Sequence, residues 1–333
     1  MDHPELVIVT LNWNGKDFVE DCITSLLSLH GCPHIIVLDN GSTDGSIDII
    51  DKYRDKLDII KKPYNLGFAG GVNVGIKRAL ELGAKYVALI NNDAIVDKNW
   101  ASELVSSMNR HADAAIVTSR LLTHDGRHID STGDFFTFWG LPYPRGREDK
   151  SEGKYLVEEE VFGGSGGASI YRAEALGTIG LFDEDFFAYF EDVDISFRAQ
   201  LLGWHVYYCP TAIAYHLIGA TSSQISGFGT YQTFKNLPQL YFKNLPSGLL
   251  WKHLFKFTIT YFGLLFSAIK KTSGGPAVHG FIKAVYLMPK TFVKRWSIQH
   301  NRVASNSRLV SIIKADPPKN QAGIWRVKRF LKI

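Results

Sequence analysis

Short apolar runs alternate with helical patterns through the first ninety residues of this 333-residue chain. Between the first two runs, apolar residues recur at three- and four-residue spacing from Phe18 to Leu29, which predicts a helix. A second helical pattern opens at Asn65–Gly75 and continues through Leu82. Such alternation predicts an α/β fold with a mostly parallel sheet, whose ligands bind at the carboxyl ends of its strands. The runs of strand length are Leu6–Leu11, His34–Leu38, Leu57–Lys61 and Tyr86–Ile90.

Polar clusters follow three of these strands at the points where they end. Asn12–Gly15 follows the first strand, Asp39 begins a turn after the second, and Asn91-Asn92-Asp93 follows the fourth. The carboxylate of Asp39 can accept a hydrogen bond from a pyrimidine ring N–H or a ribose hydroxyl. An oxygen of Asp93 suits Mg²⁺ or Mn²⁺ bridging a diphosphate. The pattern therefore indicates a nucleotide-diphosphate site at this edge of the sheet.

Further candidate functional residues lie between Thr132 and His216. Thr132–Glu160 is an irregular aromatic stretch, and loops of that length are usually lids or binding loops. Glu191 and Asp192 are adjacent carboxylates among aromatic residues, a setting that favours a raised pKa and general-base work. His216 ends the second of two short predicted strands that bracket Pro210, and its imidazole is compatible with Mn²⁺.

Seven motifs, in order over about residues 5–220, resemble glycosyltransferase family 2, which has the GT-A fold. Within the family the chain is most similar to bacterial rhamnosyltransferase-like members. The resemblance implies a Rossmann-like sheet and an inverting transfer from a nucleotide-diphosphate sugar. The motifs are VTLNWNG, LDNGSTDGS, NLGFAGG, LINNDA, GGASIYRAEAL, GLFDEDFFAYFEDVDISFRAQLLGW and YCPTAIAYH.

The resemblance also implies how the donor nucleotide is bound. Asn12, Trp13 and Asn14 would line the nucleotide, Asp39 would read the base or ribose, and Asn65 would support that pocket. The glycines after Asn65 leave two alternatives open, close helix–strand packing or contact of a backbone such as that of Gly71 with phosphate.

The resemblance assigns the metal and the base to later motifs. Asp93 matches the last position of the family's metal-binding acidic triplet, and His216 matches a later histidine on the metal side. Asn91 and Asn92 occupy positions at which the family often has acidic residues. The resemblance implies that they contact the donor, but they add no negative charge to a Mg²⁺ or Mn²⁺ site. Asp192 matches the catalytic base and Glu191 its acidic neighbour.

The charge of the chain divides sharply near Asn236. Residues 236–333 hold 17 Lys and Arg and one acidic residue, whereas residues 1–235 hold 20 Lys and Arg and 32 Asp and Glu. We therefore predict a catalytic domain over 1–235 and a helical, basic amphipathic extension over 236–333. Its longest uncharged run, Phe257–Ile269, is too short to span a bilayer, so with Trp251, Trp296 and Trp325 it predicts binding at an anionic membrane surface.

Alternatives for the extension are packing on the catalytic domain or a homo-oligomer interface, and no nucleic-acid recognition module accompanies the charge. Three scattered cysteines and the lack of a signal peptide predict a cytoplasmic protein, peripheral on the inner face of the membrane.

These features lead to one main functional hypothesis, transfer of L-rhamnose from dTDP-rhamnose to a lipid-linked or polysaccharide acceptor. A UDP-hexose or UDP-galactofuranose donor is the alternative within the same fold. A catalytically silent nucleotide-sugar-binding scaffold is the alternative from another class.

Overall fold

The structure is a computed structural model that describes residues 4–217, 225–271 and 273–318. The chain divides into two compact units. The first unit comprises residues 1–134, 144–199 and 204–224, and the second comprises residues 135–143, 200–203 and 225–333.

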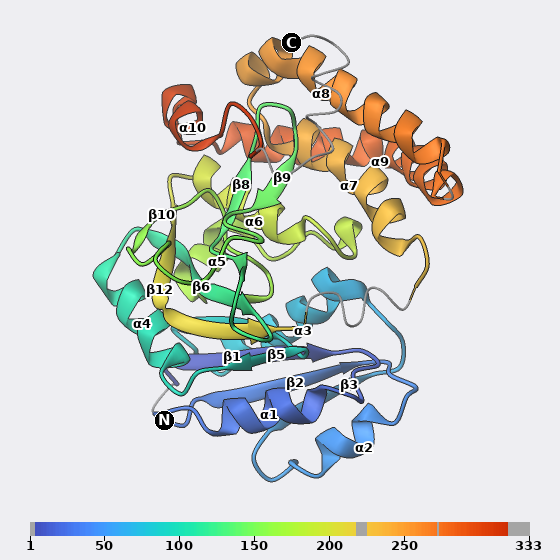
Figure 1. Cartoon of the computed structure of the whole chain (residues 1–333). Helices are drawn as coiled ribbons and strands as arrows, with labels where there is room; N and C mark the ends of the chain where they lie inside the picture. The colour runs from blue at the N-terminus through green and yellow to red at the C-terminus, as the bar shows by residue number, and fades with distance from the viewer. Residues whose placement is uncertain (1–3, 218–224, 272, 319–333) are drawn as a thin grey trace. The chain divides into compact units, whose positions relative to one another are not determined.

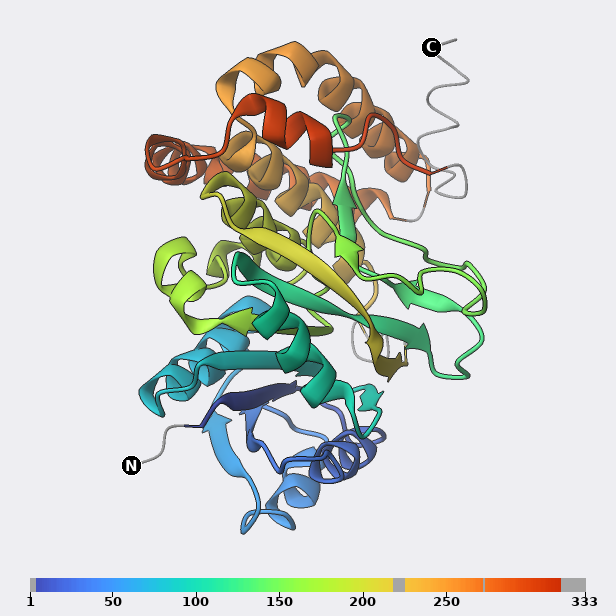
Figure 2. The same ribbon diagram turned by 90° about the vertical axis from the view of Figure 1, so that its left-hand side faces the viewer.

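A ten-stranded sheet forms the centre of the first unit, in the order β10-β12-β6-β11-β4-β1-β2-β3 with β5 and β7 beside this path. Strands β3, β2, β1 and β4 are parallel, β12 is parallel to β6, and β11 is antiparallel to both its neighbours. Figure 2 shows the blue strands β1–β3 at one end of this sheet and the yellow strand β12 toward the other. The predicted α/β fold with a mostly parallel sheet is confirmed. The strands are β1 (Leu6–Asn12), β2 (His34–Asn40), β3 (Asp58–Lys62), β4 (Tyr86–Asn91), β5 (Ala94–Val96), β6 (Ala114–Thr123), β7 (Ile129–Ser131), β10 (Glu159–Glu160), β11 (Ala168–Arg172) and β12 (His205–His216).

Helices cover the two faces of the sheet because side chains alternate along each strand. Ile8 and its neighbours on one face pack against α1 (Val19–Leu27), α2 (Ser46–Asp51) and α4 (Trp100–Arg110). Val9 points to the other face, where α3 (Gly67–Glu81) packs closely on β1. Figure 1 shows α1 and α2 below strands β1 and β2, and α3 above them. The first unit also contains α5 (Ala173–Ile179), the 3-10 turn Glu184–Phe186 and most of α6 (Glu191–Leu201).

Two local expectations differ from the structure. The segment Thr132–Glu160 contains the short strands β8 (Asp134–Phe136), β9 (Pro142–Pro144) and β10. The two strands expected around Pro210 are one strand, β12, whose register against β6 shifts between Cys209 and Ile213. A proline lacks the N–H for a ladder bond, so the shift lets the strand continue past it.

The second unit is helical and contains α7 (Phe228–Asn244), α8 (Ser247–Ile269), α9 (Gly274–His300) and α10 (Asn306–Ile312). The predicted C-terminal helical region is therefore confirmed. The predicted boundary between residues 235 and 236 falls inside α7. The whole of α7 belongs to the second unit, whose last segment begins at Ile225. Within the described residues, no helix is long and apolar enough to cross a membrane. Trp325 lies outside the described residues.

Aromatic packing holds the second unit together. The rings of Tyr241 and Phe257 stack with centroids 4.1 Å apart, and the hydroxyl of Tyr261 donates to the carbonyl of Phe234 at 2.7 Å. The indole N–H of Trp139 donates to Asp316 at 2.8 Å. The aromatic stretch around Trp139 thus belongs, from Phe135 to Tyr143, to the core of the helical unit.

Candidate active site

The ends of β1, β2 and β4 meet at the side chain of Asn12. The parallel register places Asn12 beside Asp39, and Leu11 beside Asn91. The Asn12 amide N–H₂ group lies 3.0 Å from Asp39 Oδ1, and its oxygen accepts a bond of 2.9 Å from Asn92. Asn12 is fully buried, so its side chain joins the three strand ends instead of lying on the surface. Its predicted contact with nucleotide stays a prediction.

The turn after β1 is tied to the turn after β2. The backbone N–H of Asn14 donates to the hydroxyl of Ser42 at 2.9 Å, and the Asn14 side chain accepts from the N–H of Thr43 at 2.8 Å. Asn14 has a φ of 50°, in the left-handed region that asparagine tolerates better than most residues. Trp13 beside it is partly exposed, and Ser42 N–H holds Asp39 Oδ2 at 3.2 Å.

Asn40 is a site residue that the sequence did not single out. Its buried amide donates to Asn65 Oδ1 at 2.9 Å and to the carbonyl of Gly67 at 3.1 Å, and its oxygen accepts from the N–H of Leu66. These bonds fasten the carboxyl end of β2 to the start of α3. Asn65 therefore supports this corner through Asn40. The only sequence signal for Asn40 is its position after Asp39 at a strand end.

The glycines of α3 permit a close approach to β1. A Cβ on Gly71 would lie 2.5 Å from a methyl carbon of Leu11, and one on Gly75 would lie 2.3 Å from a methyl carbon of Val9. Both separations are well inside van der Waals contact, so larger residues would push α3 away from the sheet. Packing accounts for both glycines, and contact of Gly71 with phosphate stays a prediction.

A chain of charged groups runs from Asp93 through His216 to Asp130. His216 Nε2 lies 3.0 Å from Asp93 Oδ1, and Nδ1 lies 2.8 Å from Asp130 Oδ2. Asp130 also accepts from the guanidinium of Arg147 at 2.6 Å. Pairing of β5 with the end of β12 brings His216 beside the turn that contains Asp93. Asp130, which no sequence motif indicated, fixes the ring of His216.

The hydrogen bonds among these residues favour the charged forms of His216 and Asp130. Burial opposes an imidazolium at His216, but hydrogen bonds to Asp130 and Asp93 outweigh it and raise the pKa of His216 to about 9. Burial likewise acts against ionised Asp130, yet the hydrogen bond with His216 and the charge of Arg147 hold its pKa below the ordinary value. Asp130 thus stays ionised and can orient His216.

The residues at Asp93 fit a divalent cation. Asp93 Oδ1 is buried, and in the described part of the chain it pairs with His216 Nε2. A carboxylate oxygen and an imidazole nitrogen are both donor atoms that a divalent cation such as Mn²⁺ accepts. The described residues contain no cluster of three or more acidic, histidine or cysteine side chains that could hold a metal. Other ligands would have to come from a bound diphosphate or water.

Asp192 stands at the second residue of α6, partly exposed. Its Oδ2 accepts from the N–H of Gly166 at 2.9 Å and its Oδ1 from the N–H of Val193 at 2.8 Å. Desolvation raises the pKa of Asp192, while these backbone hydrogen bonds lower it, and the net shift is upward. The carboxylate is therefore held in place and is a stronger base than a solvated one.

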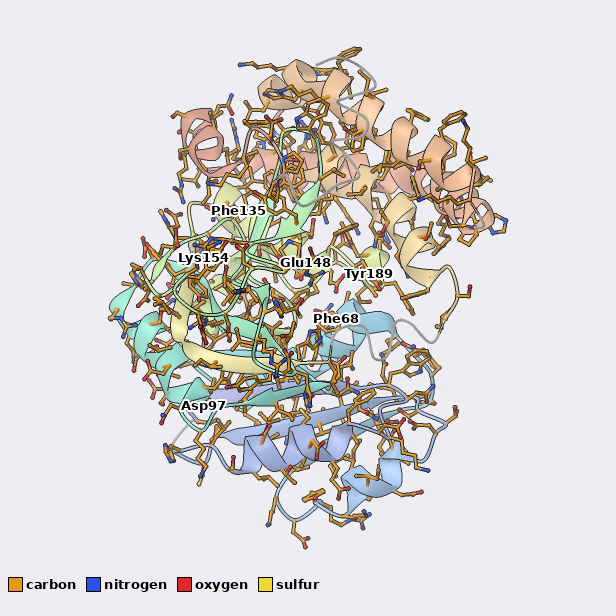
Figure 3. The ribbon with its side chains drawn as sticks, viewed as in Figure 1. Phe68, Asp97, Phe135, Glu148, Lys154 and Tyr189 are labelled. Carbon is orange, nitrogen blue, oxygen red and sulfur yellow. The ribbon has the colours of Figure 1, made fainter. Side chains whose placement is uncertain are left out.

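The backbone before α6 is strained. Phe187 has φ 61° and ψ −62°, and the N–H of Ala188 donates to the carbonyl of Phe186 at 2.7 Å, which together make a γ-turn. Tyr189 and Phe190 also have positive φ. The carbonyl of Phe187 accepts from the N–H of Ala69, so this segment packs on the start of α3, where Figure 3 labels Tyr189 and Phe68. Strain of this kind persists where surrounding contacts impose it, often at functional sites.

A glycine-rich loop, residues 163–167, connects Asp192 to the end of β4. Besides the bond from Gly166 to Asp192, the carbonyl of Gly167 accepts from the N–H of Asn91 at 3.0 Å. Gly163 exchanges two backbone hydrogen bonds with Asp134, at 2.7 and 3.0 Å. One short loop therefore sets the positions of Asp192, of the Asn91-Asn92-Asp93 triplet and of Asp134.

Asp134 is a buried carboxyl group near Asp192. Burial, and after it the negative charge of Asp192, raises the pKa of Asp134 well above its ordinary value. The hydroxyl of Tyr171 is buried in the same region and makes no hydrogen bond to any described residue. Glu191 is buried as well. The sequence reasoning missed Asp134 and Tyr171 because neither lies in a motif that distinguishes it from a core residue.

Sequence comparison places these features in a known family. Residues 6–180 match the profile of Glycosyl transferase family 2. The low-salt glycan biosynthesis hexosyltransferase Agl10 of Haloferax volcanii is 24% identical over 246 residues, covering 70% of this chain and 74% of its own. The poly-β-1,6-N-acetyl-D-glucosamine synthase of Staphylococcus aureus is 24% identical over 212 residues, covering 63% of this chain. The chain spans about half, 49%, of the length of that synthase.

Two solved structures have a similar fold. TarS residues 1–349 of S. aureus, in complex with UDP-GlcNAc, align with a TM-score of 0.56 and 17% identity over 89% of both chains. The mannosyltransferase PcManGT of Pyrobaculum calidifontis, in complex with GDP-Man and Mn²⁺, aligns with a TM-score of 0.53 and 14% identity over 90% of this chain and 85% of that one. The alignments agree with a GT-A fold, and the profile match covers more than half of the sequence. The chain belongs to glycosyl transferase family 2.

Proposed function

We propose that this glycosyltransferase moves a sugar from a nucleotide-diphosphate donor to a hydroxyl group of a growing glycan, with inversion at the anomeric carbon. One observation carries the proposal. The loop of residues 163–167 fixes a partly exposed carboxylate, Asp192, and the Asn91-Asn92-Asp93 turn through adjacent residues. A base for the acceptor and a group for the donor diphosphate are thereby held by one short piece of backbone, as a single displacement requires.

In the proposed reaction, Asp192 accepts the proton of the acceptor hydroxyl as its oxygen attacks the anomeric carbon from the side opposite the diphosphate. The raised pKa of Asp192 strengthens it as a base, and the N–H groups of Gly166 and Val193 keep its oxygens oriented. The bond from the sugar to the diphosphate breaks as the new glycosidic bond forms. Glu191 is proposed to support this end of α6.

Asp93 and His216 would hold Mg²⁺ or Mn²⁺ once His216 Nε2 gives up its proton, and Asp130 would keep His216 in the orientation that ligation needs. The bound ion would supply charge stabilisation for the departing diphosphate. The Mn²⁺ in the complex of the structurally similar PcManGT supports this choice of ion.

For the donor, we propose dTDP-rhamnose, with UDP-hexose or UDP-galactofuranose as the alternatives. Trp13 and Asn14 lie on the turn after β1, Asp39 lies near the end of β2, and Asn65 lies just before α3, which supports a nucleotide site there. The relatives act in glycan and polysaccharide synthesis by their names, which supports a glycan acceptor. We further propose that the acceptor is lipid-linked and that the enzyme works at the anionic inner face of the cytoplasmic membrane.

The test is a panel of nucleotide-sugars incubated with the full chain and Mg²⁺ or Mn²⁺, with release of nucleoside diphosphate as the readout. We expect one donor to be turned over and to raise the melting temperature at saturating concentration. Thermal stabilisation by a nucleotide-sugar without any release, even with acceptor glycans present, would instead identify a silent nucleotide-sugar-binding scaffold.

A further inference from the structure

Helices α8 and α9 each carry two apolar sides, whereas a surface helix of a globular protein carries one. On α9 the small buried residues Ala277, Gly280 and Ala284 recur at helical spacing. A Cβ on Gly280 would lie 2.4 Å from the carbonyl oxygen of Tyr231, so this side packs tightly against α7. The opposite side is also apolar, although it is exposed. Its large residues are Ile282, Val285, Tyr286, Phe292, Val293 and Trp296.

Helix α8 repeats this arrangement. Its buried side includes Phe257 and Tyr261, which stack in the core of the second unit. At 100° per residue, its exposed large residues fall within an arc of about 60° on another side. They span the whole length of the helix, from Trp251 to Ile269. The exposed residues are Trp251, Phe255, Phe262, Phe266 and Ile269. We call the exposed large residues of α8 and α9 together the apolar face.

The exposed side of α8 touches α9 through one aromatic contact. Phe262 of α8 lies with its ring 6.0 Å from that of the half-buried Phe281 of α9, in an edge-to-face contact. Most exposed large hydrophobic side chains in the described part of the chain belong to this face. Concentration of this kind, on two helices of one unit, marks an interaction surface.

Lysines run along one border of the apolar face on both helices. At 100° per residue, Lys252 and Lys256 of α8 and Lys270 at its C-cap lie beside its exposed arc. Lys283, Lys290 and Lys294 lie beside the exposed arc of α9. Lys270 reaches over the ring of Phe266 at 4.3 Å, and Lys283 over that of Tyr286 at 4.7 Å. Lysine stems that lie on aromatic rings with their ammonium groups at a border are typical of helices in a membrane interface.

The positive charge of this segment favours an anionic lipid surface over a second copy of the chain as the partner of the apolar face. Residues 236–315 contain no Asp or Glu. Joining two copies through this face would bring lysine borders together with no acidic partner in that segment, and like charges at close range repel. An anionic lipid surface supplies the negative charge, and its acyl region takes the apolar side chains.

We infer that α8 and α9 lie in the plane of an anionic bilayer with the apolar face inserted, which makes the protein monotopic. This inference rests on the membrane partner named in the proposed function and specifies the surface and the mode of binding. Insertion of the aromatic side chains carries most of the affinity, and the lysines add selectivity for anionic lipid.

The test uses the full chain and co-sedimentation with vesicles of phosphatidylcholine alone or mixed with phosphatidylglycerol, at low and high salt. A face variant combines Phe255→Ser, Phe266→Ser, Val293→Ser and Trp296→Ser. A charge variant combines Lys252→Gln, Lys270→Gln, Lys283→Gln and Lys290→Gln. A matched control combines Tyr64→Ser, Leu156→Ser and Val157→Ser, which are exposed apolar positions of the first unit.

We expect the wild type and the control to bind vesicles alike. The face variant should lose roughly a hundredfold or more in partitioning to both lipid mixtures, since each large apolar side chain contributes about tenfold when buried. The charge variant should lose only the preference for phosphatidylglycerol and its sensitivity to salt. Equal binding by the face variant and the wild type, or no binding by the wild type, would overturn the inference.

Two further measurements distinguish insertion of the apolar face into lipid from pairing of two copies. Bromine-labelled lipids should quench tryptophan fluorescence of the wild type, whereas Trp251→Phe with Trp296→Phe should bind vesicles normally and show much less quenching. Analytical ultracentrifugation without lipid should show monomers, and a wild-type dimer that the face variant abolishes would overturn the inference in favour of a second copy. Nucleotide release from a soluble donor, measured on every variant, reports the proposed function separately and should not change.

Discussion

The two units of this protein use polar and apolar residues in opposite ways. In the first unit, polar side chains at the strand ends are buried or half-buried and joined by hydrogen bonds, as at Asn12, Asn40 and His216. In the second, large apolar side chains are exposed along α8 and α9. Catalysis requires individual side chains at fixed positions. Binding to a fluid membrane surface requires only that a helix face have the right content of apolar and basic side chains. The difference separates what we propose as chemistry from what we propose as attachment.

The largest effect should follow substitution of the proposed base. Asp192→Asn should lower glycosyl transfer by about 10²- to 10⁴-fold, the usual contribution of a general base. Binding of the donor, measured by calorimetry, should change little because the base acts on the acceptor. Asp125→Asn, at an exposed turn, is the matched control. Transfer above about a hundredth of the wild-type rate would remove Asp192 from the role of base.

The proposed metal ligand should come next. Asp93→Ala should reduce transfer by roughly a hundredfold or more, since a bound cation is worth several kcal/mol of charge stabilisation. Part of the loss should be recovered by raising Mg²⁺ or Mn²⁺ well above the level that saturates the wild type. Full wild-type activity in excess chelator would contradict the metal requirement.

Substitution of Asp130, which contacts His216 Nδ1, should have a smaller effect on transfer. Asp130→Asn keeps the size of the side chain but removes the charge that orients the imidazole. Apparent affinity for the metal should fall about 10- to 100-fold, with little change in the rate at saturating metal. A titration of activity with Mn²⁺ measures this, and an unchanged midpoint would show that Asp130 is structural only.

Asp134 should respond differently from Asp192 to the same substitution. Asp134 has a raised pKa, so the free energy of unfolding of the wild type falls as pH rises from the pKa of an unfolded aspartate to that of folded Asp134. Asp134→Asn cannot ionise, so it should be more stable than the wild type at pH 8, and the difference should vanish below about pH 4. Melting temperatures across this range test the sign, and parallel curves for both proteins would refute it. Transfer should remain within about threefold of wild type, in contrast to Asp192→Asn.

The smallest effects concern close helix packing in each unit. Gly71→Ala forces α3 away from Leu11, and Gly280→Ala forces α9 away from the carbonyl of Tyr231. Each should cost about 1–2 kcal/mol of unfolding free energy, with Gly280→Ala the larger because backbone yields less than a methyl group. Denaturant unfolding measures both. A selective rise in the donor KM for Gly71→Ala, without loss of stability, would instead support contact of Gly71 with phosphate.

Periodicity alone predicted the first four strands of the sheet. Strands β1 to β4 lie within two residues of their expected positions, because continuous apolar runs bounded by polar turns have few alternative structures. Local pairs were also predictable. Asp194 bonds Arg198 at 2.9 Å, as four-residue spacing on a helix implies, and Asp183 accepts from the N–H of Asp185 at the turn before α6.

The ordered motifs identified the family correctly, and the residues in them gather at one edge of the sheet. Their roles as nucleotide, metal and base residues remain predictions. The donor sugar was beyond reach, since base and sugar selectivity depend on the shape of a pocket and not on a motif.

What the sequence by itself determined was the class of fold, the family, the strand ends at which polar residues collect, and the basic, aromatic character of the tail. Only the tertiary structure decided that the buried Asn12 joins Asp39 and Asn92, and that Asp134 lies near Asp192. It alone also decided that Asp130 bonds His216, 86 residues away in the sequence. It also decided that the aromatic stretch from Phe135 to Tyr143 packs with the helical unit and that α8 and α9 expose a second apolar side. Periodicity records contacts within a turn or a strand, whereas pairings between distant segments depend on how strands align and helices pack, which no local pattern encodes.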